Sequence, residues 1–192
     1  MIRQGVTLIA TAVLGAGLLA GCGSSGESAE APAEEGKTEV GTGSVGGDPV
    51  FDGDVGFQVT TVNKLPKELP AVVQQAIDDS DEYELPDGAA VWTADVKVTN
   101  NGTKSVAPVC SSSVIAAIDQ KDREYDMASS IDIMSATQTG KSMFCTTVQP
   151  GFSKTGTVYF ATPDDSTIES FRLYNSSEPD DALGDTYVVI KR

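Results

Sequence analysis

Residues 91–102 read VWTADVKVTNNG, and apolar and polar side chains alternate along them up to an Asn-Gly pair. Alternation with a period of two predicts a β-strand with one buried face. Asn101-Gly102 tolerates positive φ and is therefore typical of a tight turn after the strand. Shorter stretches of the same kind recur at residues 55–62, 106–118, 143–148, 156–160, 168–174 and 186–190. Several short strands broken by turns predict an all-β sandwich.

One stretch departs from this pattern. Residues 69–78 favour a short helix, because their apolar residues recur at helical spacing. One face of that helix would carry Val72, Val73, Ala76 and Ile77. The chain shows no internal repeat, so we expect a single β-sandwich domain with one short helix.

The first 21 residues are typical of a signal peptide. A basic start precedes an apolar run of fifteen residues, 6–20, whereas a membrane-spanning helix needs about 20. The run ends in Leu19-Ala20-Gly21-Cys22, which resembles the bacterial lipobox. We therefore expect cleavage between Gly21 and Cys22 and attachment of a diacylglyceryl group to the Cys22 thiol. An uncleaved signal anchor, or a secretory peptide with an incidental cysteine, is the alternative.

Residues 23–49 contain no aromatic residue and only two large aliphatic ones, Val40 and Val45. Such a stretch cannot bury enough apolar surface to offset the loss of conformational entropy on folding. We therefore expect a disordered acidic tether over residues 22–49 and a sandwich domain over residues 50–192. Removing residues 1–21, which hold one arginine and no acid, changes the net charge from −15 to −16. The lipid rather than the acidic chain must then supply the attachment to the membrane.

Two cysteines remain once Cys22 is assigned to lipid. Cys110 and Cys145 form an even pair in a predicted oxidising compartment, and both lie in strand-like segments. A structural disulfide between them would close a loop of 35 residues. The alternative is a redox pair or a soft-metal site with methionines, although the Cys-X-X-Cys spacing of redox dithiols is missing. The methionines in question are Met127, Met134 and Met143.

Composition excludes several classes of protein. The chain offers no cluster of Lys or Arg for nucleic-acid phosphates. It contains no histidine, which removes Ser-His-Asp and Cys-His catalysis and the usual zinc and copper sites. Residues 139–142 end like a phosphate-binding loop, but Ser135 stands where the first glycine is required. No Gly-x-Ser-x-Gly motif occurs, so we expect a protein that is not an enzyme and needs no cofactor.

Two acidic clusters remain as candidate sites. The first supplies hard oxygen donors that could hold extracellular calcium: Asp78, Asp79, Asp81 and Glu82. It lacks the glycine of an EF-hand loop, since Tyr83 occupies the sixth position. A solvated charged loop is the simpler interpretation. The second cluster lies in residues 178–185, and the same two interpretations apply to it, with a solvated charged loop again the simpler one.

Three turn patterns resemble those of a known family. They are Asn100-Asn101-Gly102, the segment from Asp119 to Tyr125, and Pro150-Gly151 leading to Phe160. They are similar to patterns in bacterial lipoproteins that carry an immunoglobulin-like domain of unknown function, grouped with the immunoprotective extracellular protein superfamily. The resemblance covers residues 55–192 and implies an immunoglobulin-like β-sandwich on the cell exterior. This chain departs from the pattern at Asp122, where glycine is usual, and in an acidic, partly helical insertion over 63–90.

The anchor, the tether and the missing catalytic residues together predict a function. We expect a lipid-anchored lipoprotein on the extracytoplasmic face of the cell membrane, presenting an immunoglobulin-like domain to a protein or envelope partner. The alternative is an extracytoplasmic protein that binds calcium or another small ligand.

Overall fold

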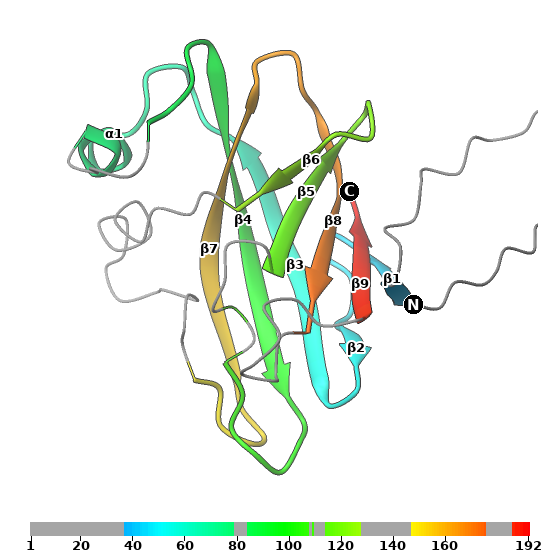
Figure 1. Cartoon of the computed structure of the whole chain (residues 1–192). Helices are drawn as coiled ribbons and strands as arrows, with labels where there is room; N and C mark the ends of the chain where they lie inside the picture. Colours follow the sequence, from blue (N-terminus) through cyan, green and yellow to red (C-terminus); the bar gives the residue numbers. More distant parts are fainter. Residues whose placement is uncertain (1–36, 79–83, 108, 110–113, 128–146, 176–185) are drawn as a thin grey trace, which may run out of the picture. The chain divides into compact units, whose positions relative to one another are not determined.

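The computed structural model describes residues 37–78, 84–107, 109, 114–127, 147–175 and 186–192, all within the unit Ala31–Arg192. The strands of this unit form two sheets, in the orders β1-β9-β8-β5-β6 and β2-β3-β4-β7 (Figure 1). The predicted all-β sandwich with one short helix is confirmed. Its elements are β1 (Thr38–Ser44), β2 (Val50–Asp52), β3 (Val55–Lys64), α1 (Ala71–Asp78), β4 (Ala89–Asn100), β5 (Ile115–Asp119), β6 (Glu124–Asp126), β7 (Ser153–Pro163), β8 (Ile168–Tyr174) and β9 (Thr186–Lys191).

The strand order is that of an immunoglobulin-like sandwich. Strand β4 pairs with β7 in one sheet, while β5, β8 and β9 are neighbours in the other. These pairings match the B–E pair and the C–F–G sheet of immunoglobulin domains.

Strand β4 shows how the alternation of apolar and polar side chains places one face of a strand in the core. Ala94, Val96 and Val98 are completely buried, while Asp95 and Lys97 between them are half-exposed. The buried side chains belong to one core cluster that also contains Phe171 and other residues of the opposite sheet. Burial of this apolar face, at roughly 25 cal/mol per Å² of apolar surface, holds the two sheets together.

The predicted strands at 55–62, 156–160, 168–174 and 186–190 are confirmed as parts or all of β3, β7, β8 and β9. The expected strand at 106–118 is wrong in extent. Its described residues form a strand only from Ile115, while Val106 makes an isolated bridge with Val148. Most of the expected strand at 143–148 lies outside the described residues.

The predicted tether is wrong over residues 38–49, because these residues belong to the sandwich. Strand β1 pairs in parallel with β9, from Thr38 opposite Thr186 to Ser44 opposite Lys191. The pairing consists of hydrogen bonds between backbone groups, which every residue except proline can donate and accept. A segment with few apolar side chains can therefore form a strand that its composition does not predict. Glycine also permits a close approach here, since a Cβ on Gly43 would lie 2.5 Å from the side chain of Val50.

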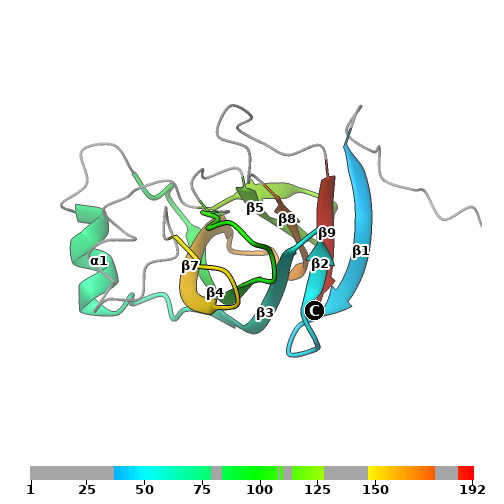
Figure 2. The same ribbon diagram turned by 90° about the horizontal axis from the view of Figure 1, so that it is seen from below.

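Helix α1 confirms the predicted helix, and its packing corrects one detail. Val73 and Ile77 are buried in a small cluster with Val91 and Tyr159, on the outer side of the β4–β7 pair (Figure 2). Val72 was expected on the same face but is 49% exposed. No helix among the described residues is long and apolar enough to cross a bilayer.

Candidate functional site

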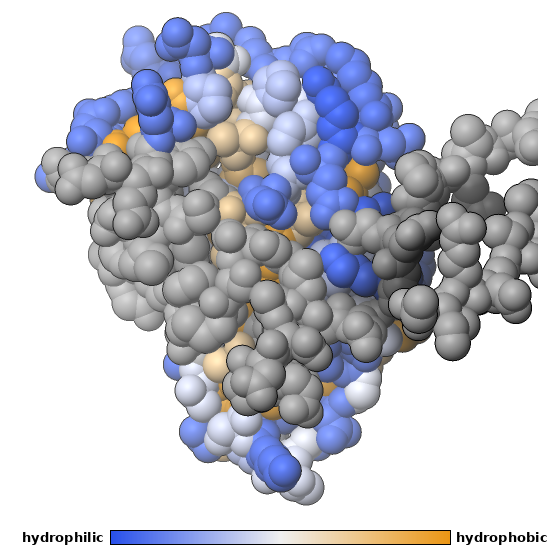
Figure 3. Space-filling model, in the orientation of Figure 1, coloured by the Kyte–Doolittle hydropathy of each residue, from blue (hydrophilic) through white to orange (hydrophobic). Residues whose placement is uncertain are grey.

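The sandwich has two ends, which carry different side chains. We call the end where β1 starts the entry end; β4 also finishes there, at Asn100, and β7 starts there, at Ser153. A hydrogen bond between the sheets shows that these strand ends meet. Thr186, which pairs with Thr38 of β1, donates its hydroxyl to the Asp52 carboxylate at 2.6 Å, and Asp52 is connected to Asn100 of β4 through the pairing of β2 and β3. The far end is where β3 and β5 finish and β8 starts. The far end lies at the top of Figure 1 and forms a largely hydrophilic surface in Figure 3.

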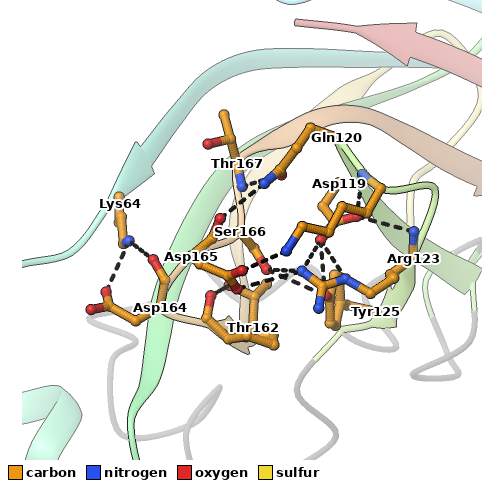
Figure 4. Close-up of polar contacts among 12 residues, drawn as sticks. Lys64, Asp119, Gln120, Arg123, Tyr125, Thr162, Asp164, Asp165, Ser166 and Thr167 are labelled. Carbon is orange, nitrogen blue, oxygen red and sulfur yellow. Dashed lines mark hydrogen bonds and ion pairs between the residues drawn. The ribbon is translucent and has the colours of Figure 1, made fainter.

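Asp119 is the centre of a polar cluster at the far end. Its side chain has no exposed surface. Oδ1 accepts the backbone N–H groups of Lys121 at 2.9 Å and Arg123 at 3.0 Å. Oδ2 accepts Arg123 Nε at 2.8 Å and the Tyr125 hydroxyl at 3.0 Å, and Arg123 Nη2 lies 2.6 Å away (Figure 4).

These contacts decide the protonation state of Asp119. Burial alone would raise the pKa of its carboxyl, but the hydrogen bonds from Arg123, Lys121 and Tyr125 hold that pKa well below its usual range. The carboxylate therefore stays ionised at any physiological pH. A group that cannot take up a proton in this range is poorly suited to general acid–base catalysis, and its role is to hold the turn between β5 and β6.

The same turn is joined to the turn between β7 and β8. Arg123 Nη2 donates to the Ser166 hydroxyl at 2.9 Å. Gln120 donates from its side chain to the Asp165 carbonyl at 2.9 Å and from its backbone to the Thr167 carbonyl at 3.0 Å. Two turns about forty residues apart in sequence therefore form one pre-organised surface (Figure 4).

Ion pairs extend this surface. Asp164 lies 3.1 Å from the ammonium groups of both Lys64 and Lys67, and their hydrogen bonds lower the pKa of its carboxyl. Asp165 pairs with Lys121, which lowers the pKa of Asp165 in the same way. These groups are exposed, so each pair adds little stability, but together they fix the pattern of charges that the far end presents.

Asn100 organises the entry end. It is completely buried, and its amide donates to the carbonyls of Lys104 at 2.8 Å and Val148 at 2.9 Å. Its side-chain oxygen accepts the N–H of Gly102 at 2.9 Å. Among the described residues, positive φ occurs at Asp122, Gly46, Gly53, Gly88 and Gly151. The expected positive-φ turn at Asn101-Gly102 is therefore wrong; the Asn100 side chain supplies the turn instead.

The predicted turn at Pro150-Gly151 is confirmed. Gly151 has φ +77°, and the Phe152 N–H donates to the Gln149 carbonyl at 3.1 Å, as a type II turn requires. The Asn100 N–H donates to the Phe152 carbonyl at 3.0 Å, which joins this turn to the end of β4. Phe152 itself is 67% exposed.

The site residues expected from the sequence fall mostly outside the described residues. Those outside are Gly21, Cys22, Asp79, Asp81, Glu82, Cys110 and Cys145. Asp78 is the last residue of α1 and accepts a hydrogen bond from Gln74 at 2.8 Å. The described part of the chain contains no group of three potential metal ligands of the His, Cys, Asp or Glu type. Lipidation, the disulfide and calcium binding all stay predictions.

Sequence reasoning missed the roles of Asp119 and Asn100, although both stand in the motifs it singled out. A turn motif predicts where the chain reverses direction, but it does not predict which side chain holds the turn. The glycine that is usual at position 122 in the similar family is a signal for a left-handed backbone in this turn, and Asp122 indeed has φ +55°.

Comparison with known proteins shows family and fold. The family described as "Domain of unknown function (DUF4352)" matches residues 44–176. No curated protein matches the chain. The secreted protein MPT63 of Mycobacterium tuberculosis is 17% identical, with TM-score 0.52 over 79% of this chain and 96% of that one. The yjhA protein of Bacillus subtilis is 14% identical, with TM-score 0.51 over 78% of this chain and 98% of that one. Both have the same sandwich fold.

Proposed function

This chain belongs to the DUF4352 family, and on that premise we propose that it is a lipid-anchored, non-catalytic recognition module on the extracytoplasmic face of the cell membrane. It presents the far end of its sandwich to a protein or envelope partner. The expected lipid attachment is at Cys22.

The parallel pairing of β1 with β9 is the observation that carries this proposal. It places the start of β1, at Thr38, at the end of the sandwich opposite the turns of the Asp119 cluster. Fifteen residues separate Thr38 from Cys22. An anchor at Cys22 therefore enters the domain from the entry end and leaves the far end accessible to a partner.

The far end is suited to recognition. Its two turns are cross-linked by Arg123 and Gln120, so a partner would pay little ordering entropy on binding. Its charged groups are exposed yet held in place by ion pairs, which favours electrostatic selection of a partner. Asp119 is held ionised, which argues against a catalytic proton transfer there.

Anchoring is tested by feeding cells an alkyne-labelled fatty acid and comparing the wild type with Cys22→Ser. The wild type should be labelled and should sediment with membranes, and the variant should be unlabelled. An unlabelled wild type would contradict the proposed anchor.

Recognition is tested by photo-crosslinking in intact cells. A photoreactive amino acid replaces Lys121 at the far end or, as a control, Lys97 on the side of β4. We expect a discrete adduct only from position 121, and we expect excess unmodified protein to compete it away. No adduct at 121, equal adducts at both positions, or turnover of an envelope substrate by the purified protein would contradict the proposal.

A further inference from the structure

Strand β1 is the part of the sandwich that tension on the anchor would reach first. Its first residue, Thr38, lies at the entry end, and the chain before it leads to Cys22. The parallel pairing directs β1 from the entry end toward the far end, with Thr38 opposite Thr186 and Ser44 opposite Lys191. A lipid held in the bilayer and a partner held at the far end would therefore pull β1 along its own axis.

The direction of this pull decides how the pairing of β1 with β9 can fail. Strands that are pulled apart from one end lose their hydrogen bonds one after another, whereas strands that slide past each other must lose them together. The hydrogen bonds of a parallel ladder are evenly spaced along both strands, so the six register pairs of β1 and β9 would share a pull on Thr38. Strand β9 cannot follow β1, because β8 pairs with its other edge.

A side chain of the other sheet lies in the path of this sliding motion. Val50 of β2 contacts β1 at Gly41 and Gly43, where an added Cβ would lie 2.7 Å and 2.5 Å from its two methyl carbons. Both glycines stand opposite buried residues of β9, Val188 and Ile190, so they belong to the inner face of β1. The methyl groups of Val50 therefore occupy a gap that β1 leaves open only because it has no side chain there.

Val45 closes this gap on its far-end side. Burial alternates from Gly41 through Gly43 to Val45, so Val45 continues the inner face, and it packs against the core. If β1 slid toward the entry end by two residues, Val45 would replace Gly43 opposite Val50. That position does not admit even one added carbon without a shift of Val50, so the valine would be stopped there.

Backbone hydrogen bonds join the far-end side of β1 to both sheets. The Val45 N–H donates to the Lys191 carbonyl of β9 at 2.8 Å. The next residue, Gly46, donates its N–H to the Val59 carbonyl of β3 at 2.9 Å. Figure 2 shows the resulting arrangement, with β1 beside β9 and β2 close to both. Tension on the anchor therefore cannot reach β2 until the pairing of β1 with β9 has failed.

We infer that β1, β9 and Val50 form a mechanical clasp, which keeps the sandwich folded when the anchor and a partner at the far end are pulled apart. The pairing resists tension by lengthwise shear, and Val50 blocks sliding because it is caught between the two glycines of β1 and Val45. The inference rests on the proposed function, which supplies the two points of attachment. It adds that the domain holds its partner against force.

The test is single-molecule force spectroscopy on the purified chain from Cys22 to Arg192, without lipid. In the first geometry the handles are attached at residue 22 and at residue 192, so tension shears β1 along β9. In the second geometry the handles are attached at residue 48 and at residue 192. Asp48 and Arg192 are exposed and follow the far-end sides of β1 and β9, so this tension peels the same two strands apart from one end.

We expect the unfolding force to be about twofold higher or more in the first geometry, because forced unfolding follows the unfolding barrier and shear raises that barrier. In the first geometry Val50→Ala should lower this force by about a third, since it removes the block to sliding. Val62→Ala is the matched control and should lower the force less. Val62 is also a partly buried valine of the main core, but it lies in β3 opposite Ala94.

Equal forces in the two geometries, or equal losses from Val50→Ala and Val62→Ala, would overturn the clasp. The measurement needs no lipid, so such a result contradicts the clasp alone. An unlabelled wild type in the fatty-acid experiment contradicts the proposed function instead.

Discussion

Arg123 holds the buried carboxylate of Asp119 with two guanidinium nitrogens, Nε at 2.8 Å and Nη2 at 2.6 Å, and the same Nη2 reaches Ser166 at 2.9 Å. One side chain thus joins the turn after β5 to the turn before β8. The far end keeps its shape because of this relationship.

Asp119→Asn should destabilise the fold. The substitution places an amide N–H among donors and removes the buried carboxylate that Arg123 pairs with, so we expect a loss of about 2–3 kcal/mol at pH 7. The native pKa of Asp119 lies below its unfolded value of about 3.9, so its stabilisation is present above pH 4 and is lost as pH falls through the native pKa. Urea unfolding between pH 2 and 7 should therefore show a shallower acid loss in the variant. Asp164→Asn, at the exposed ion pairs with Lys64 and Lys67, is the control. Equal stability of the two variants would contradict this role.

Asn100→Ala should destabilise the entry end. It removes three hydrogen bonds, of which the one to Val148 is buried, and leaves the carbonyl of Val148 without its side-chain donor, so we expect a loss of about 2–4 kcal/mol. Asn101→Ala, at an exposed neighbour, should cost less than about 0.5 kcal/mol. Thermal unfolding of both variants checks this, and a similar melting temperature for the two would count against the Asn100 role.

Asp122→Gly should stabilise the protein by about 0.5–1 kcal/mol. Asp122 has φ +55°, a conformation that costs energy for a residue with a Cβ and little for glycine. The matched control, Asp126→Gly in strand β6, should destabilise instead, because glycine weakens a strand. A fall in the free energy of unfolding of Asp122→Gly would show that the Asp122 side chain makes a contribution larger than the strain.

Gly43→Ala should loosen strand β1. The new Cβ would lie 2.5 Å from Val50 and 3.2 Å from Ile190, so we expect a loss of about 1–3 kcal/mol from overpacking. Val50→Ala removes the nearer obstacle, so the double variant should lose less than the sum of the two single changes. Additive losses in a double-mutant cycle would mean that β1 does not pack against Val50 as the structure describes.

The predicted disulfide between Cys110 and Cys145 should be visible on reduction. Closing a loop of 35 residues stabilises a fold by about 3.8 kcal/mol in the chain-entropy model. Reductant should therefore lower the melting temperature of the wild type and leave that of Cys110→Ser/Cys145→Ser unchanged. Cys22 should not respond, since a thioether to lipid is not reduced. An unchanged wild type would contradict the disulfide.

Local patterns in the sequence predicted the elements whose signal is local. Alternation predicted strand β4 and its buried Val96 and Val98, and residues 168–174 match the bounds of β8. The Pro150-Gly151 turn followed from the geometry of its two residues. Strand β1 could not be predicted in this way, because its stability comes from backbone pairing with Thr186–Lys191, at the other end of the chain.

The sequence by itself determined the all-β class, the short helix and the turns, because side-chain periodicity and backbone preference act over a few neighbouring residues. Only the tertiary structure decided what the turn residues do. Asp119 is held ionised because Arg123 and Tyr125 fold back onto it, and the turn before β8 brings Ser166 to the same guanidinium. Strand pairing between distant segments sets which charges meet, and no local pattern encodes that pairing.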